Sequence, residues 1–152
     1  MSQTVSILKE LQSILTDIKK ADGWQTELGE SVHRGFYTHV LHDSSTRFPA
    51  VVIHPPTEDP IAVRGGGKGA RILVTIPVIM AARIGSDATA YDELSLAAAD
   101  TRRAIFSARD RLTQITNDEA LTVGVAEPEI SADSRFALSA FMVSVEFSEF
   151  YT

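Results

Sequence analysis

The feature that most constrains this chain is a long alternation of apolar side chains at residues 71–82. In an extended strand, successive side chains point to opposite faces of the sheet, so every second residue shares a face. One face of this segment would carry Ile72, Val74, Ile76, Val78 and Met80. A second alternation, at 136–147, would place Phe141, Val143, Val145 and Phe147 together. The sequence therefore predicts two long strands that each turn one face toward a hydrophobic core.

Two segments show helical spacing instead. In residues 4–20 apolar side chains recur every three or four positions, so we expect an amphipathic helix capped by Ser2 or Thr4 and ended by Asp22 and Gly23. A second helix is predicted from about 89 to 112, with two arginines in its last turn, Arg109 and Arg111. Its interior, LSLAAADTRRAIF, is rich in alanine, which permits close packing against a sheet.

Three further strands complete the predicted fold: one at about 32–41, one in FPAVVIHP and a short one around LTVGVAE. Pro77 has no backbone N–H to donate, so we expect a sheet edge or a bulge at that residue. The order is then α-β-β-β-α-β-β. We predict a single α+β domain over residues 1–152, with a mostly antiparallel sheet of about four to five strands flanked by two helices.

The stretch RGGGKGAR at 64–71 invites comparison with a phosphate-binding loop. Such a loop follows a strand, opens a helix and has the spacing GxxxxGK[ST]. Here Lys68 is followed by Gly69, and a strand-like segment comes next, so the nucleotide-binding interpretation fails. We instead expect TEDPIAVRGGGKGAR to be a loop of about fifteen residues without regular secondary structure.

Composition narrows the possible environments. The chain has 152 residues, no cysteine and a formal net charge of −6. The net negative charge comes from residues 77–152, which hold six arginines, no lysine and twelve acids. This balance argues against tight binding to nucleic-acid phosphates. Charged residues interrupt the first apolar segment, and no run approaches the length of a membrane span, so we expect a soluble protein without a signal peptide.

No group of residues in the sequence matches a known catalytic or metal-binding pattern. The four histidines, His33, His39, His42 and His54, form no HExxH motif, and we interpret them as solvated or structural. No GxSxG motif is present. Arg102 and Arg103 point about 100° apart on a helix, and we expect Arg103 to form a surface ion pair with Asp100. We therefore predict no enzyme activity, cofactor or metal.

Two long connections carry opposite charge. The first contains Arg64, Lys68 and Arg71. The second, NDEALTVGVAEPEISADSR, is anionic through Asp118, Glu119, Glu127, Glu129 and Asp133. Complementary patches on separate surfaces are what a head-to-tail, ring-forming subunit needs. Two unrelated solvated loops would give the same pattern.

The whole chain resembles the tail terminator (tail completion) family of tailed bacteriophages. The resemblance rests on the order of ILKELQSILTDI, FPAVVIHP, ILVTIPVIMAA, DTRRAIFSARD and the terminal FMVSVEFSEFYT. It implies a non-enzymatic virion protein that forms a hexameric ring on the tail tube, ends tube polymerisation and joins the tail to neck proteins of the head. It also implies a location at the upper end of the tail, and in the host cytoplasm during assembly.

The resemblance suggests roles for both charged segments. Arg64, Lys68 and Arg71 would reach a neighbouring subunit or the tube as an arm, and Phe150 and Tyr151 are further interface candidates. DNA would pass through the ring without specific binding, past a channel lined by some of the acids. Candidates are Asp118, Glu119, Glu127, Glu129 and Asp133, with Glu146 and Glu149 also considered; acids on the outer rim are the alternative.

Four other interpretations remain open. Within the same class, the chain could be a stopper or a tube protein. From a different class, it could be a small cytoplasmic α+β enzyme or a ligand-binding domain.

Overall fold

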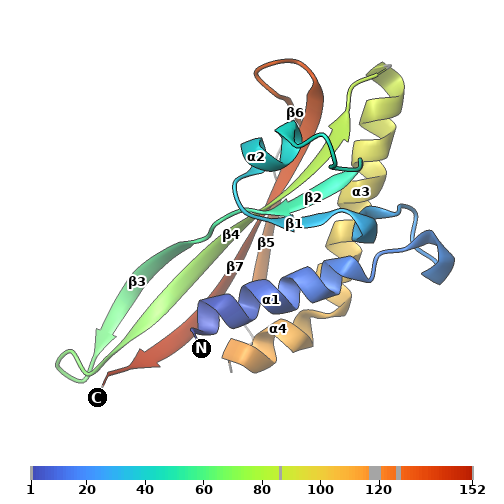
Figure 1. The fold of residues 1–152 in the computed structure, drawn as a ribbon. Helices are drawn as coiled ribbons and strands as arrows, with labels where there is room; N and C mark the ends of the chain where they lie inside the picture. The colour runs from blue at the N-terminus through green and yellow to red at the C-terminus, as the bar shows by residue number, and fades with distance from the viewer. Residues whose placement is uncertain (1, 86, 117–120, 126–127, 152) are drawn as a thin grey trace.

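A computed structural model describes residues 2–85, 87–116, 121–125 and 128–151. These residues form an α+β fold with four α-helices and one seven-stranded mixed sheet (Figure 1). The helices are α1 (Gln3–Thr16), α2 (Tyr37–His42), α3 (Asp87–Ser107) and α4 (Arg109–Thr116). The strands are β1 (Val32–Arg34), β2 (Ala50–Ile53), β3 (Thr57–Arg64), β4 (Gly69–Arg83), β5 (Leu121–Val125), β6 (Glu129–Ile130) and β7 (Phe136–Phe150).

The two long strands predicted from alternation form the centre of the sheet. β4 and β7 pair antiparallel along their full lengths, from Gly69 opposite Phe150 to Arg83 opposite Phe136. β2 and β3 pair with the outer side of β4, and β5 and β6 pair with the outer side of β7. Only β1 and β2 run parallel among the described pairs, so the expectation of a mostly antiparallel sheet is confirmed.

The faces of the sheet differ in how they are covered. The even-numbered residues of β4 from 72 to 82 and the odd-numbered residues of β7 from 141 to 147 pack in one core with α1, α3 and α4. On the opposite face a small cluster of Leu41, Ala81 and Phe136 lies under α2. α2 thus covers one end of this face, and further along it Met142 is exposed.

Helix α1 forms largely as expected. Ile7, Leu8, Leu11, Ile14 and Leu15 are all buried. The hydroxyl of Ser2 accepts a hydrogen bond from the N–H of Val5, which confirms Ser2 as the cap. The helix ends at Thr16 rather than at Asp22, because the chain turns there into two short 3-10 helices, η1 (Lys20–Asp22) and η2 (Leu28–Glu30).

The prediction of a strand at 32–41 was wrong beyond Arg34, where β1 ends. Gly35 has φ 134°, a conformation that favours glycine, and its N–H donates to the carbonyl of Ile53. The chain then forms α2, in which Tyr37 and Leu41 are one turn apart and pack on the end of the sheet. Tertiary packing overrides the β-propensity of these residues.

The single helix expected over 89–112 is divided. α3 ends at Ser107 and α4 begins at Arg109, so Arg109 and Arg111 lie in the first turn of α4 rather than in a last turn. α3 packs against the sheet, whereas α4 packs against α1, where Arg111 forms an ion pair with Glu10. The two packing partners lie in different directions, which accounts for the break at Ala108.

Pro77 is not on an edge strand, because β4 has neighbours on both sides. Its carbonyl accepts a hydrogen bond from the N–H of His54, so its nitrogen faces the same side of β4. On that side β2 ends opposite Val78 and β3 begins opposite Thr75. The residue without an N–H therefore lies at the gap between two partner strands.

Candidate interaction surface

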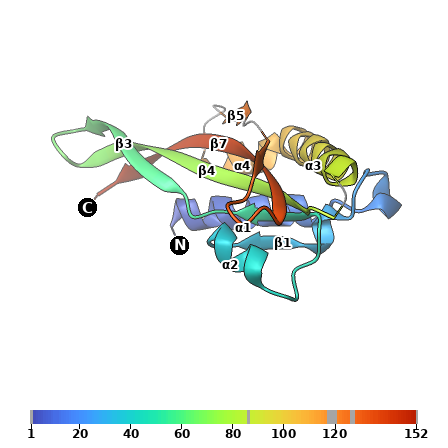
Figure 2. The same ribbon diagram turned by 90° about the horizontal axis from the view of Figure 1, so that it is seen from above.

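The segment expected to be an irregular loop is the outer part of a three-stranded arm. β3 pairs with the first half of β4, and the last residues of β7 lie on the other side of β4. The arm extends away from the helices in both views (Figures 1 and 2). All eight residues of β3 are exposed. The expectation of no regular structure failed because Pro60 and a fully exposed strand leave no alternation of apolar residues to detect.

A tight turn of glycines closes the arm. Gly65, Gly66 and Gly67 have φ values of 59°, 66° and 90°, which residues with a Cβ rarely adopt. The N–H of Lys68 donates to the carbonyl of Arg64 at 3.1 Å. The glycines therefore serve a hairpin turn between β3 and β4 rather than a phosphate site or an unstructured loop.

The C-terminal end of β7 is attached to this turn. The N–H of Tyr151 donates to the carbonyl of Lys68 at 2.7 Å, and Figure 1 shows the C-terminus beside the turn. Phe150 lies in a cross-strand row with Gly69 and Arg64. The Tyr151 hydroxyl donates to the Glu149 carboxylate at 2.8 Å, which raises the pKa of Tyr151 above its usual value.

The three candidate cations differ in their surroundings. Arg64 and Lys68 are exposed at the arm tip. Arg71 is only partly exposed, and its Nε lies 2.5 Å from Oε2 of Glu146 on β7. Arg71 and Glu146 are diagonal neighbours across the β4–β7 pair, so this ion pair joins two strands of the arm. We therefore define the arm tip by Val63, Arg64, Lys68, Phe150 and Tyr151.

The acids proposed for a channel are separated in the structure. Asp118, Glu119 and Glu127 lie outside the described residues. Glu129 is exposed on β6, and Asp133 is exposed in the turn between β6 and β7. Asp133 accepts hydrogen bonds from the Ser131 hydroxyl and the N–H of Arg135, which lower its pKa and favour the ionised form.

The other two acids lie at the opposite end of β7. Glu146 and Glu149 belong to the arm, where they interact with Arg71 and Tyr151. The structure therefore places Glu129 and Asp133 near the end of β7 that is away from the arm, and Glu146 and Glu149 in the arm.

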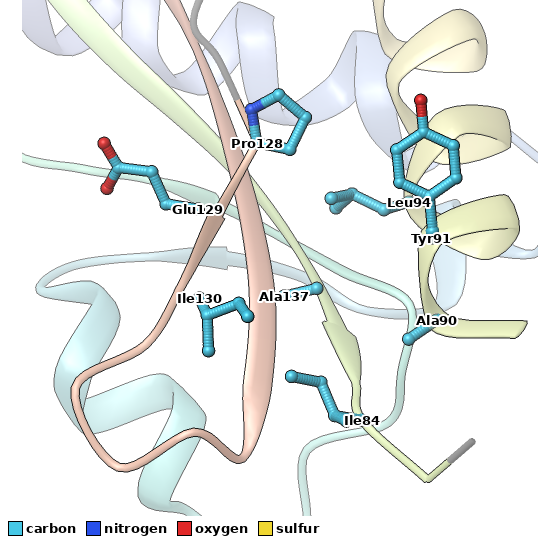
Figure 3. A pocket seen from close by; sticks show the side chains of 8 residues that line it. All are labelled: Ile84, Ala90, Tyr91, Leu94, Pro128, Glu129, Ile130 and Ala137. Atoms are coloured by element: carbon cyan, nitrogen blue, oxygen red, sulfur yellow. The ribbon is translucent and has the colours of Figure 1, made fainter. Parts of the chain in front are cut away.

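Sequence reasoning did not identify an apolar pocket that opens between α3 and β6. Its volume is about 230 Å³, and it is lined by Ile84, Ala90, Tyr91, Leu94, Pro128, Glu129, Ile130 and Ala137. Figure 3 shows Tyr91 and Leu94 on the α3 side and Pro128, Glu129 and Ile130 on the β6 side. These residues come from distant parts of the chain, so no local pattern marks them.

The ion pair expected between Asp100 and Arg103 is not formed. Asp100 is buried, and its carboxylate accepts hydrogen bonds from the N–H groups of Gln25 and Thr26 and from the Thr26 hydroxyl. Arg103 instead lies over the ring of Trp24, 4.3 Å from its centroid, and donates to the carbonyl of Gly23. Both side chains hold the segment after α1 against α3.

The histidines are placed mainly by packing. The rings of Phe36 and Tyr37 contact His54, and the ring of Phe136 contacts His42. His33 lies 2.9 Å from the Ser31 hydroxyl, and burial lowers its pKa. Over the described part of the chain, no group of three or more His, Cys, Asp or Glu residues could hold a metal ion.

No model of a known protein family matches the chain, and neither does the sequence of any curated protein. Among the helices that the structure describes, none is long and apolar enough to cross a membrane. The function of the chain is therefore inferred from the geometry and chemistry of its residues.

Proposed function

We propose that this chain is a tail terminator: a non-enzymatic virion protein that forms a ring, hexameric in the resembled family, on the end of a phage tail tube. The ring would end tube polymerisation and present a surface to the neck proteins. The observation that carries the proposal is the arm. β3 pairs with β4 along its length, but all eight of its residues stay exposed, so the strand buries little surface within its own chain.

The chemistry of the arm supports contact with another protein. Its tip combines exposed apolar side chains at Val63 and Phe150 with the cations Arg64 and Lys68. Large apolar side chains surrounded by polar ones are typical of protein interfaces. The partners in this proposal are other copies of the chain, the tube protein (and the sheath, if the tail contracts) and a neck protein.

The net charge supports a passive role toward DNA. Six copies carry a formal charge of 6 × (−6) = −36. An acidic channel repels the phosphate backbone and lets DNA pass without sequence preference. Of the candidate acids that the structure describes, Asp133 is exposed in the turn between β6 and β7 and suits such a lining.

Electron microscopy of the purified protein, alone and mixed with tail tubes, tests this function. We expect ring-shaped particles with a central opening, and rings on one end of each tube. A chain that stays monomeric at all concentrations and leaves tube ends bare would contradict the proposal. A ring whose opening is lined mainly by arginine and lysine, or tight salt-sensitive binding to duplex DNA, would contradict the passive channel alone.

A ligand-binding domain or enzyme is the second candidate, and one observation favours it. Glu93 lines a depression of about 450 Å³ together with Asp92, Lys20 and Glu27, and burial raises the pKa of Glu93. Perturbed acids in depressions are frequent at functional sites. Native mass spectrometry of the purified protein distinguishes the two candidates, since a bound small molecule displaced by Glu93→Gln would favour this second one.

A further inference from the structure

Four large apolar side chains are the most exposed among the described residues, and they form two groups. Phe150 and Val63, 78% and 72% exposed, belong to the arm tip. Ile130 and Tyr91, 66% and 61% exposed, line the pocket between α3 and β6. Each exposed apolar side chain that could be covered favours association, by about 1.5–3 kcal/mol when burial is complete. Both groups therefore have the character of contact surfaces.

The two groups lie at opposite ends of the same pair of strands. Gly69 and Phe150 mark the arm end of the β4–β7 pair, and Ile84 and Ala137 lie at the pocket end. A strand of fifteen residues spans roughly 45 Å at about 3.3 Å per residue. Because the pairing of β4 and β7 is continuous between them, the arm tip of one chain cannot reach its own pocket.

The pocket suits a protein side chain better than a separate ligand. Its volume of about 230 Å³ lies below the roughly 300–1,000 Å³ of typical small-molecule sites. Its walls are apolar, and the one charged residue among those that line it, Glu129, lies at its rim with the carboxylate turned to the other side of β6 from Tyr91 and Leu94 (Figure 3). An aromatic ring would fit the cavity, and a cation beside the ring could reach Glu129 around the edge of β6.

The arm tip offers that combination. Phe150 stands in the cross-strand row with Gly69 and Arg64, and Gly69 has no side chain to cover its ring. The hydrogen bond from Tyr151 to Lys68 attaches this end of β7 to the turn, so Phe150 is presented from a paired strand. Little ordering is then required when the ring is buried, which lowers the cost of binding.

Pairing of β3 with a strand of another molecule would be the simpler contact, but β3 is poorly suited to it. Pro60 lacks an N–H, and the register shifts between Pro60 and Ala62 as at a bulge. Proline and bulges on an edge strand are devices that prevent strand addition. Side chains at the tip are therefore better suited to contact than the strand edge.

We propose that the arm tip of one copy docks into the pocket of a second copy, with Phe150 entering the pocket and Arg64 and Lys68 reaching Glu129 at its rim. The contact is head-to-tail, so repetition closes into a ring or continues as a filament. This contact would specify how the subunits of the proposed ring join, and it rests on the proposed ring function for the number of copies. The commitment to a second copy rests on opposite charge and on matching apolar surfaces at the two ends of one rigid strand pair.

Two complementary variants test the contact by sedimentation velocity. Phe150→Asp disables the tip, and Ile130→Asp disables the pocket; both positions are exposed, so folding should be preserved. Phe106→Asp, at an exposed position on α3 outside both surfaces, is the matched control. We expect wild type and control to associate with rising concentration, and each interface variant to associate at least about tenfold more weakly.

Mixing the two interface variants gives the decisive result. The intact tip of one can enter the intact pocket of the other, but the remaining tip and pocket are both disabled. The mixture should therefore stop at a one-to-one heterodimer. Unchanged association of either variant alone, or growth of the mixture beyond the heterodimer, would overturn the proposal.

Crosslinking keeps the test informative when association is weak. The chain has no cysteine, so thiols introduced by Phe150→Cys in one sample and Tyr91→Cys in another can be joined selectively by oxidation. Phe150→Cys mixed with Lys9→Cys, on the exposed side of α1, is the control pair. A disulfide in the first mixture that exceeds the control is expected, and equal yields would refute the contact.

The two proposals fail in different ways. Rings on tube ends without the specific crosslink would refute the tip–pocket contact while leaving the terminator function standing. A specific crosslink and a one-to-one heterodimer, with bare tube ends, would refute the terminator function while leaving the contact standing.

Discussion

Replacing Asp100 with alanine should destabilise the fold more than any surface change on α3. Its carboxylate accepts from Gln25 N–H at 3.1 Å, from Thr26 N–H at 2.8 Å and from the Thr26 hydroxyl at 2.7 Å. Gln25 is exposed, so water can replace the first bond. Thr26 is buried, so its two donors would lose their acceptor. Each such loss costs about 1.5–2 kcal/mol, which gives roughly 3 kcal/mol in total.

The measurement is urea unfolding followed by the fluorescence of Trp24, the single tryptophan, which adjoins this segment. A slope of about 2 kcal/mol per molar urea converts 3 kcal/mol into a midpoint shift of about 1.5 M. Far-UV circular dichroism should give the same midpoint if unfolding is two-state. Asp100→Asn, which keeps an acceptor oxygen, should lose about half as much stability.

Asp92→Ala is the control, because Asp92 is exposed on the same helix. We expect it to change the free energy of unfolding by no more than about 0.5 kcal/mol. If Asp100→Ala matched this control, the carboxylate would not hold the segment after α1, and the reasoning from its three hydrogen bonds would be refuted.

Three further predictions concern packing, the arm and pH. Gly29→Ala should lower the free energy of unfolding in urea by more than about 2 kcal/mol, because the added Cβ would clash with the backbone carbonyl oxygens of Thr16 and Ile18. Gly85→Ala is the control and should be near neutral, because there is open space around Gly85. Equal effects of the two substitutions would contradict this prediction. A double-mutant cycle of Arg71→Ala and Glu146→Ala should give a coupling of about 1 kcal/mol in the free energy of unfolding, because the ion pair is partly buried. A coupling of zero would contradict a role for this pair in stabilising the arm. Burial lowers the pKa of His33 below 6.5. The contribution of neutral His33 to stability is therefore present above pH 6.5 and declines as the pH falls from 6.5 toward the folded-state pKa. His33→Gln should flatten this pH dependence of the free energy of unfolding between about pH 8 and 5, and an unchanged slope would contradict the prediction.

The parts of the fold that sequence could predict are those with a periodic buried face. β4 and β7 alternate over many residues and bury every second one against a single core. α1 likewise carries a complete apolar stripe. In these elements local pattern and tertiary burial coincide, so the pattern was sufficient.

The parts that sequence could not predict depend on contacts between distant residues. α2 has only six residues and is stabilised by packing on Ala81 and Phe136. β3 has no buried face, so its extended form comes from pairing with β4. Asp100 resembles a solvated acid in a charged run, DTRR, until the chain at Gln25 and Thr26 is brought against it.

The candidate surfaces divide in the same way. Arg64, Lys68 and Phe150 were identified from charge and from the terminal aromatic residues, and the structure brings them together at the arm tip. The pocket was missed because α3 and β6 contribute to it from segments that adjoin only after folding. A sequence shows charges directly, whereas a concave apolar surface exists only in three dimensions.

The continuous pairing of β4 with β7 has a consequence for assembly. The same fifteen-residue register that builds the core also sets the separation between the arm tip and the pocket. A slip by one residue would turn Phe147 and Val145 out of the core, so this register is strongly specified. The spacing between the two contact surfaces is therefore as rigid as the core itself. In the proposed ring, the length of each subunit would be set by a paired sheet instead of a flexible loop, and we therefore expect a ring of defined size.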